Sequence, residues 1–184
     1  MIKLLEFRTC SGLRPGLKRQ VLDILRGCDD EVTPPLSQRG GLVAMGPGAG
    51  ERPMGIERYA DELSTQEFIL AFDDNILVGS MAYRTDYTPE ALKHVLADNK
   101  CVYINMLAVR PLYRRMGVAS SLYRSLLAMP VYKNHAITLR TGSDNVRHHR
   151  VLERLDFQEA ARIPNERGPG VDTVYYLHRG KRPA

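Results

Sequence analysis

The stretch LAVRPLYRRMGVASSLYRSLL, residues 107–127, joins the end of an apolar strand to a cationic turn and an amphipathic helix. After the turn, apolar side chains recur at helical spacing at Val118, Leu122 and Leu126. Gly117 stands at the helix start, where backbone N–H groups lack partners and the helix dipole is positive. This pattern is typical of an anion site at the carboxyl end of a buried strand.

Two interpretations of the turn stay open from its residues alone. In the first, Gly117 lets an anion approach the main chain, Ala119 is too small to block it, and Arg114 and Arg115 add positive charge. In the second, Gly117 only shapes a tight turn, and the two arginines face solvent. The pattern is neither GxGxxG nor GxxxxGK[ST], so it predicts neither a Rossmann nor a P-loop nucleotide site.

The segments on either side of this stretch predict a mixed sheet. The apolar run CVYINMLAV, 101–109, is typical of a central strand, and HAITLR, 135–140, of the next one. Together with the helix between them they form a βαβ unit, whose two strands are parallel neighbours. The stretch 67–84 predicts a hairpin that turns at Asp74-Asn75.

The remaining pattern completes one α/β (α+β mixed) domain over residues 1–184, with no internal repeat. Residues 31–53 are rich in Gly and Pro and predict a long loop, which is either mobile or functional. Residues 180–184 predict a solvated basic tail. Further strands are expected at 2–8, 157–163 and 172–179, and further helices at 15–27, around 56–63, at 88–97 with Thr88 as cap, and at 145–155.

The composition is that of a globular protein. Hydrophobic residues make up 43% and charged residues 26% of the 184 residues, which argues against a disordered or fibrous chain. The formal charge of +5 suits an anionic ligand but is low for a dedicated nucleic-acid binder. No apolar run approaches the roughly 18 residues that a membrane span needs. We therefore expect no membrane association, and no nucleic acid as the main partner.

The three cysteines, Cys10, Cys28 and Cys101, are odd in number and widely spaced. They form neither a CxxC pair nor a His/Cys pattern suited to zinc. We therefore expect no metal and a reducing, cytoplasmic location.

The succession from Leu107 to Ala119 resembles the acyl-CoA signature of the GNAT N-acetyltransferase superfamily. In that signature a strand ends in apolar-x-Val, Pro and an aromatic residue follow, and the turn reads Arg or Gln-x-x-Gly-x-Gly or Ala. The resemblance covers nearly the whole chain in the order of elements and about 105–157 in specific residues. It implies a central mixed, mostly antiparallel sheet with a splayed pair of parallel strands, flanked by helices on both faces.

The resemblance also implies acetyl-CoA as the cofactor. The backbone of the strand end would pair with the pantetheine arm, while these residues also pack as ordinary core. Asn145 matches an asparagine that commonly faces the cofactor, although it is equally a natural helix cap. The cofactor-binding residues implied are Leu107, Ala108, Val109, Arg114, Arg115, Met116, Gly117, Val118, Ala119, Ser120 and Asn145.

The chain departs from the family where a tyrosine often protonates the leaving thiolate, because Leu152 stands there. Asp156 likewise replaces the glycine that usually ends this helix. His148, on the inward helix face, and His149, one turn from Asn145, are candidate replacements if either has a pKa near neutrality. For both, a structural or solvated role is the alternative, and a bound water, Tyr175 or Tyr176 also stays open.

Asn105 occupies the strand position where several family members have a glutamate that deprotonates the amine. An amide is not a base, but it can hold a water or a substrate carbonyl. The alternative is a hydrogen bond to a neighbouring strand or a bulge. On the acceptor side, Asp29, Asp30 and Glu31 could attract a cationic amine, or they could simply end a helix in solvent.

These observations predict an N-acetyltransferase that acts on a small-molecule or peptide amine by direct attack in a ternary complex. A CoA-binding module without catalysis is the alternative that Leu152 and Asn105 suggest. An RNA- or ribosome-associated protein is the third hypothesis, suggested by the net charge and by the cluster RHHR at 147–150. The natural acceptor and the acyl length are not encoded in any recognisable motif, and a homodimer stays open.

Overall fold

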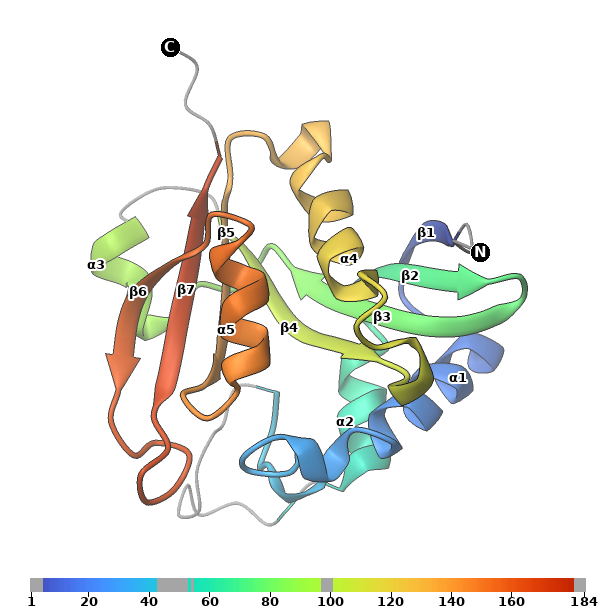
Figure 1. The fold of residues 1–184 in the computed structure, drawn as a ribbon, viewed down its shortest axis with the longest axis horizontal. Helices are drawn as coiled ribbons and strands as arrows, with labels where there is room; N and C mark the ends of the chain where they lie inside the picture. Colours follow the sequence, from blue (N-terminus) through green and yellow to red (C-terminus); the bar gives the residue numbers. More distant parts are fainter. Residues whose placement is uncertain (1–4, 43–52, 54, 97–100, 181–184) are drawn as a thin grey trace.

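The computed structural model describes residues 5–42, 53, 55–96 and 101–180. One seven-stranded sheet, in the order β1-β2-β3-β4-β5-β7-β6, runs through the molecule (Figure 1). All neighbouring strands are antiparallel except β4 and β5. The strands are β1 (Glu6–Ser11), β2 (Glu67–Asp73), β3 (Ile76–Arg84), β4 (Cys101–Val109), β5 (Ala136–Gly142), β6 (Gln158–Ile163) and β7 (Thr173–Arg179).

Helices cover both faces of the sheet, because its strands carry apolar side chains on both sides (Figure 1). On one face pack α4 and α5, and on the other α1, α2 and, toward β6, α3. The helices are α1 (Pro15–Arg26), α2 (Ile56–Leu63), α3 (Lys93–Leu96), α4 (Val118–Leu127) and α5 (Val146–Glu153). Short 3₁₀ turns are η1 (Asp29–Glu31), η2 (Leu36–Gln38), η3 (Glu90–Leu92), η4 (Pro111–Tyr113) and η5 (Pro130–Tyr132).

The parallel pair β4–β5 separates part-way along its length. The two strands pair only from Cys101 with Ala136 to Ile104 with Leu139. Beyond that point β4 continues to pair with β3 as far as Val109, and β5 continues to pair with β7 as far as Gly142. The predicted mixed sheet with a splayed parallel pair and helices on both faces is therefore confirmed, and it leaves one edge of β4 free.

Most predicted elements lie within a few residues of their observed limits. The turn of the β2–β3 hairpin has Asp74 at φ 53°, a left-handed conformation that Asp tolerates. The first strand lies at Glu6–Ser11 instead of 2–8, of which residues 2–4 lie outside the described part. Residues 43–52 of the predicted loop, and 181–184 of the predicted tail, also lie outside it.

The helix predicted at 88–97 begins two residues later than expected, and residue 97 lies outside the described part. It consists of η3 and then α3, and the N-cap of η3 is Pro89 without a side-chain cap bond, so Thr88 is not the cap. In the described part of the chain, no helix has both the length and the apolar character needed to cross a membrane.

Gly79 in β3 allows α4 to lie close to the sheet. A Cβ atom at this position would lie 2.8 Å from Val118 Cγ1 and 3.4 Å from Leu122 Cδ1. Because Val118 begins α4, the same contact places the start of that helix beside the end of β4, with which Gly79 pairs at Val109.

We predict that Gly79→Ala lowers the free energy of unfolding by about 1–3 kcal/mol, since the added methyl overpacks the interface with α4. Gly16→Ala in α1 is the matched control, because a Cβ there meets nothing within 4 Å. It should cost nothing and add up to about 1 kcal/mol through helix propensity. Urea unfolding of both variants measures the difference, and equal stability of Gly79→Ala and wild type would contradict the close packing.

Candidate functional site

The turn before α4 presents a row of backbone donors. Arg115 and Gly117 both have positive φ, at 60° and 83°. From Arg115 to Ser120, no backbone N–H donates to a described main-chain acceptor, and the first bond of the helix runs from Ser121 N to Gly117 O at 2.9 Å. A Cβ at Gly117 would meet nothing within 4 Å, so the space beside this residue is open. This turn can therefore accept an anion.

The predicted cofactor residues around the turn differ in exposure. Val118 is buried under the helix, whereas Ala119 and Ser120 are partly exposed in its first turn. Arg115 and Met116 are exposed, so their side chains are available to a ligand.

Arg114 already has partners in the protein. It donates to Glu31 Oε1 at 2.6 Å, to the Val109 carbonyl at 3.2 Å and to Cys28 Sγ at 3.3 Å. These bonds hold its guanidinium toward η1 and the end of β4. The ion pair also occupies Glu31, one of the three acidic residues considered for the acceptor. Asp29, another of them, accepts from the Ser37 backbone and hydroxyl at 2.8 and 2.6 Å and so braces the loop.

The separation of β4 from β5 opens a cavity of about 110 Å³ between the two strands. Residues Asn105–Ala108 line one side of it and residues Arg140–Gly142 the other. Leu107 and Ala108 from the predicted cofactor set therefore lie at this cavity, next to the free edge of β4. Val109 ends the strand.

Asn105 forms a bulge in β4. Ala82 pairs with Met106 and Tyr83 with Ile104, so Asn105 has no opposite residue in β3. Its Nδ2 donates to Gln66 Oε1 at 2.8 Å, while its Oδ1 is buried and has no hydrogen-bond partner. The bulge predicted as an alternative is thus present, and the side-chain amide uses only its donor half.

His148 is the predicted histidine that lines the cavity. Its Nε2 lies 2.8 Å from the Tyr123 hydroxyl, and its Nδ1 lies 3.3 Å from Thr141 Oγ1. Burial, together with the charges of His149 and Arg167, lowers the pKa of His148 to about 4. The expected pKa near neutrality is therefore wrong for this residue, and His148 is neutral at pH 7.

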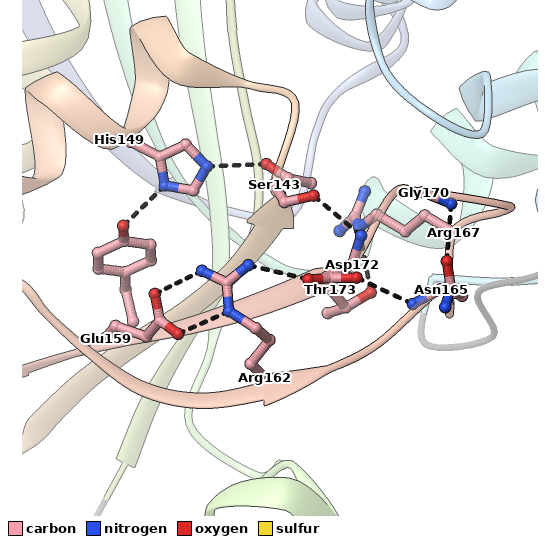
Figure 2. Close-up of polar contacts among 11 residues, drawn as sticks. Ser143, His149, Glu159, Arg162, Asn165, Arg167, Gly170, Asp172 and Thr173 are labelled. Atoms are coloured by element: carbon pink, nitrogen blue, oxygen red, sulfur yellow. Dashed lines mark hydrogen bonds and ion pairs between the residues drawn. The ribbon is translucent and has the colours of Figure 1, made fainter.

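His149 is held by hydrogen bonds to residues of β5 and β7 (Figure 2). Its Nε2 lies 2.9 Å from the Gly142 carbonyl and its Nδ1 lies 2.7 Å from the Tyr176 hydroxyl. Since a carbonyl only accepts, Nε2 carries the proton, and in the neutral ring Nδ1 accepts from Tyr176. Both nitrogens thus have structural partners, and His149 is not among the cavity-lining residues.

Three further residues singled out in the sequence keep structural roles. Asn145 caps α5, with its Oδ1 accepting from His148 N at 3.3 Å, and it also lines the cavity. Leu152 is fully buried in the core under α4 and α5. Asp156 has φ 61°, so it adopts the left-handed conformation for which the family usually has glycine.

The sequence analysis missed a group of arginines at the same cavity. Arg39, Arg140 and Arg167 come from three distant segments and all line it. Arg140, a charge inside an otherwise apolar strand, was a detectable signal. Arg167 lies in a Gly- and Pro-containing turn and had none. Among the described residues, no group of three or more His, Cys, Asp or Glu side chains is placed to hold a metal ion.

Comparisons with known proteins agree with this architecture. The model of the acetyltransferase (GNAT) family matches residues 43–157. A search of curated protein sequences finds no match. Among solved structures, NAA60 of Arabidopsis thaliana, in complex with a bisubstrate analogue, aligns with a TM-score of 0.66 at 14% identity. That alignment covers 96% of this chain and 98% of the other.

Two bacterial structures are similar at the same level. yncA of Salmonella typhimurium, determined with its cofactor acetyl-CoA, has a TM-score of 0.63 at 12% identity, with 98% of this chain and 96% of that chain covered. The ribosomal-protein-S18-alanine N-acetyltransferase of Escherichia coli has a TM-score of 0.64 at 12% identity, with 98% and 97% covered. These likenesses show the fold. Because the family model matches well over half of the residues, the chain belongs to the GNAT acetyltransferase family.

Proposed function

We propose that this protein transfers an acetyl group from acetyl-CoA to a primary amine of a small molecule or peptide, by direct attack within a ternary complex. The observation that carries this proposal is that two stretches of backbone without main-chain partners occur in the same structure. One is the row of unpartnered amides from Arg115 to Ser120, and the other is the unpaired edge of β4 beyond Ile104. An elongated ligand with a diphosphate at one end and amides along its arm matches both.

The residues present fit that donor. The open space at Gly117 lets phosphate oxygens reach the amides of the turn, and the exposed Arg115 can add charge. Arg114 could join only by exchanging its ion pair with Glu31 for a phosphate. The backbone of Leu107 and Ala108 lies at the cavity and offers groups to the pantetheine amides, whereas the Val109 carbonyl already accepts from Arg114. Asn145 lines the same cavity.

Bound there, the donor supplies an acyl thioester, and the chain contributes mainly position. Asn105 lines the cavity, but its unpartnered Oδ1 is buried, so we assign it no direct bond to the attacking amine. Leu152 stands where the family often has a tyrosine. The neutral His148, which is hydrogen-bonded to the Tyr123 hydroxyl, is a polar ring on the same helix. With a pKa of about 4 it is neutral at pH 7 and a weak base, so we assign it a hydrogen-bonding role in the cavity wall and not the removal of the amine proton.

A CoA-binding module without catalysis is the second candidate function. It is suggested by Leu152, which is fully buried and has no hydroxyl to protonate a leaving thiolate. The RNA-binding hypothesis receives less support, since the cluster at 147–150 is not one basic surface. His148 lines the cavity and His149 is bound to Gly142 and Tyr176.

Thiol release separates these hypotheses. We expect purified protein with acetyl-CoA to release free CoA thiol in the presence of some primary amine or peptide from a broad panel. CoA-induced thermal stabilisation without thiol release from any acceptor would instead identify a binding module. Steeply salt-dependent RNA binding that CoA does not displace would identify the third hypothesis.

We predict that Gly117→Glu weakens CoA binding by about 100-fold or more, because a carboxylate at the turn repels the phosphates by several kcal/mol. Gly170→Glu is the matched control. Gly170 also has a left-handed φ, 77°, and a Cβ there meets nothing within 4 Å, so the backbone strain is comparable. Isothermal titration with CoA measures both, and equal affinity of the two variants would argue against the turn as the phosphate site.

The lowered pKa of His148 makes stability depend on pH. Between pH 6.5 and about 4 the unfolded state binds more protons at this residue than the folded state, so stability falls as the pH falls through this window. At about 1.4 kcal/mol per pKa unit, wild type should lose about 2 kcal/mol more than His148→Gln between pH 7 and pH 5. Urea unfolding at both pH values measures this, with the exposed His94→Gln as control. Identical pH dependence in wild type and His148→Gln would contradict the buried neutral imidazole.

A further inference from the structure

We propose that the acceptor amine carries a carboxylate, which Arg39, Arg140 and Arg167 bind at the cavity between β4 and β5. This inference rests on the proposed acetyl transfer and names its substrate class: amino acids or closely related small amino carboxylates.

The three arginines converge from separate parts of the fold. Arg39 follows η2, Arg140 lies in β5, and Arg167 lies in the turn between β6 and β7. All three line the same cavity as Asn105. This cationic lining matches a small ligand that carries an acidic group.

The guanidinium groups repel one another in the free protein. Burial, followed by the charges of Arg39 and Arg140, lowers the pKa of Arg167 to about 10. Burial and the charge of Arg140 also lower the pKa of Arg39. Burial alone would lower the pKa of Arg140 as well, but Tyr103, Tyr175 and Glu166 outweigh it, so the pKa of Arg140 is raised. All three remain charged at pH 7, so a bound anion would relieve this repulsion.

Carboxylates of the protein do not neutralise this lining in full. Within the described ranges, neither Arg39 nor Arg167 forms an ion pair with an acidic side chain. Asp144 also lines the cavity, but it accepts from the Thr33 hydroxyl at 2.8 Å. Glu166 acts on Arg140 through its charge. Among the described residues, Asp144 and Glu166 are therefore the acidic side chains that act on this group of three arginines.

Arg39 and Arg167 are fixed in place by hydrogen bonds that use only some of their donors. Arg39 donates from Nε to the Pro34 carbonyl at 3.2 Å. Arg167 donates from Nη1 to the Thr33 carbonyl at 2.8 Å and from Nε to Thr173 Oγ1 at 3.1 Å. A guanidinium has five N–H donors, so these bonds orient each group and leave others for a ligand.

The turn that carries Arg167 is itself braced (Figure 2). Asp172 accepts from Arg162 at 3.0 Å and from the Asn165 backbone at 3.0 Å, and its own N–H donates to Ser143 Oγ at 2.9 Å. These bonds tie the turn to the segment that follows β5. Arg167 is consequently only 5% exposed and is held rigidly, as a group that recognises a planar carboxylate must be.

The arginines face the side of the sheet opposite to the turn at Gly117. Leu139 packs in the core under α4 and α5, and Thr141 contacts His148 of α5, so Arg140 between them points to the other face. That face is covered by α1 and α2, whose residues Leu25 and Tyr59 also line the cavity. The cationic group is thus on a different face of the sheet from the proposed phosphate site.

The rest of the lining limits the size of the ligand. The cavity holds about 110 Å³, and Leu25, Val32, Leu36 and Met106 contribute apolar surface. A small amine with a short apolar body and one carboxylate fits these surfaces, and two N–H donors from one guanidinium can bind a carboxylate side by side.

Binding of acetylated products tests the inference without requiring turnover. The probes are N-acetylglycine, N-acetyl-L-alanine and N-acetyl-L-leucine, each compared with its carboxamide and its phosphonate analogue by calorimetry on CoA-saturated protein. We expect the carboxylates to bind at least about tenfold more tightly than the carboxamides, as loss of a charge-assisted pair predicts. Equal affinity for carboxylates and carboxamides, or tighter binding of the phosphonates, would overturn the proposal.

Substitution of the arginines assigns the effect to this cavity. Arg39→Met and Arg140→Met should each bring the carboxylate-to-carboxamide ratio close to one, while thermal unfolding and CoA affinity stay near wild type. Arg140→Lys should restore part of the ratio. The control is Arg124→Met, which removes an exposed charge from α4. A preference that survives in both Arg39→Met and Arg140→Met, or that falls equally in Arg124→Met, would overturn the assignment.

The same samples distinguish failure of this inference from failure of the proposed function. If CoA binds but carboxylate probes show no preference, the acetyl-donor site stands and the acceptor class is wrong. If CoA neither binds nor stabilises the protein, acetyl transfer is wrong, and the probe comparison is repeated on the free protein. There the arginine-dependent preference for carboxylate is still expected, and its absence overturns the anion site.

Discussion

The limited pairing of β4 with β5 is the constraint on which the rest of the site depends. A backbone edge that loses its partner strand inside a fold must find other hydrogen-bond partners or remain accessible to a ligand. Here β4 keeps β3 on one side, while its other edge is free beyond Ile104. The bulge at Asn105 falls where the strands part, so the cavity and the free edge begin at one local irregularity of β4.

Much of the fold was predictable because its signals are local. Residues 101–109 form a strand as their apolar run indicated, and Asp74 adopts the turn conformation its residue type favours. The boundaries failed where tertiary contacts decide them, as at Glu6–Ser11, whose pairing partner β2 lies some sixty residues later in the chain. Periodicity within one segment carries no information on such a partner.

The candidate site was predictable only in part, for a similar reason. The turn at Gly117 is contiguous in sequence, so its free amides followed from the local pattern. The ion pair between Arg114 and Glu31 spans 83 positions, and the lining by Arg39, Arg140 and Arg167 requires three segments to meet. Residue types alone likewise misjudged the pKa of His148, because burial and not the imidazole itself sets it.

The close contact at Gly79 has a geometric consequence for ligand choice. This one residue pairs with Val109 at the end of β4 and supports Val118 at the start of α4. The free strand edge and the start of α4 are therefore held at a fixed spacing through this one residue. For the donor proposed above, that spacing sets the distance between its phosphates and its amide-bearing arm, and it is set by the backbone and not by a side chain.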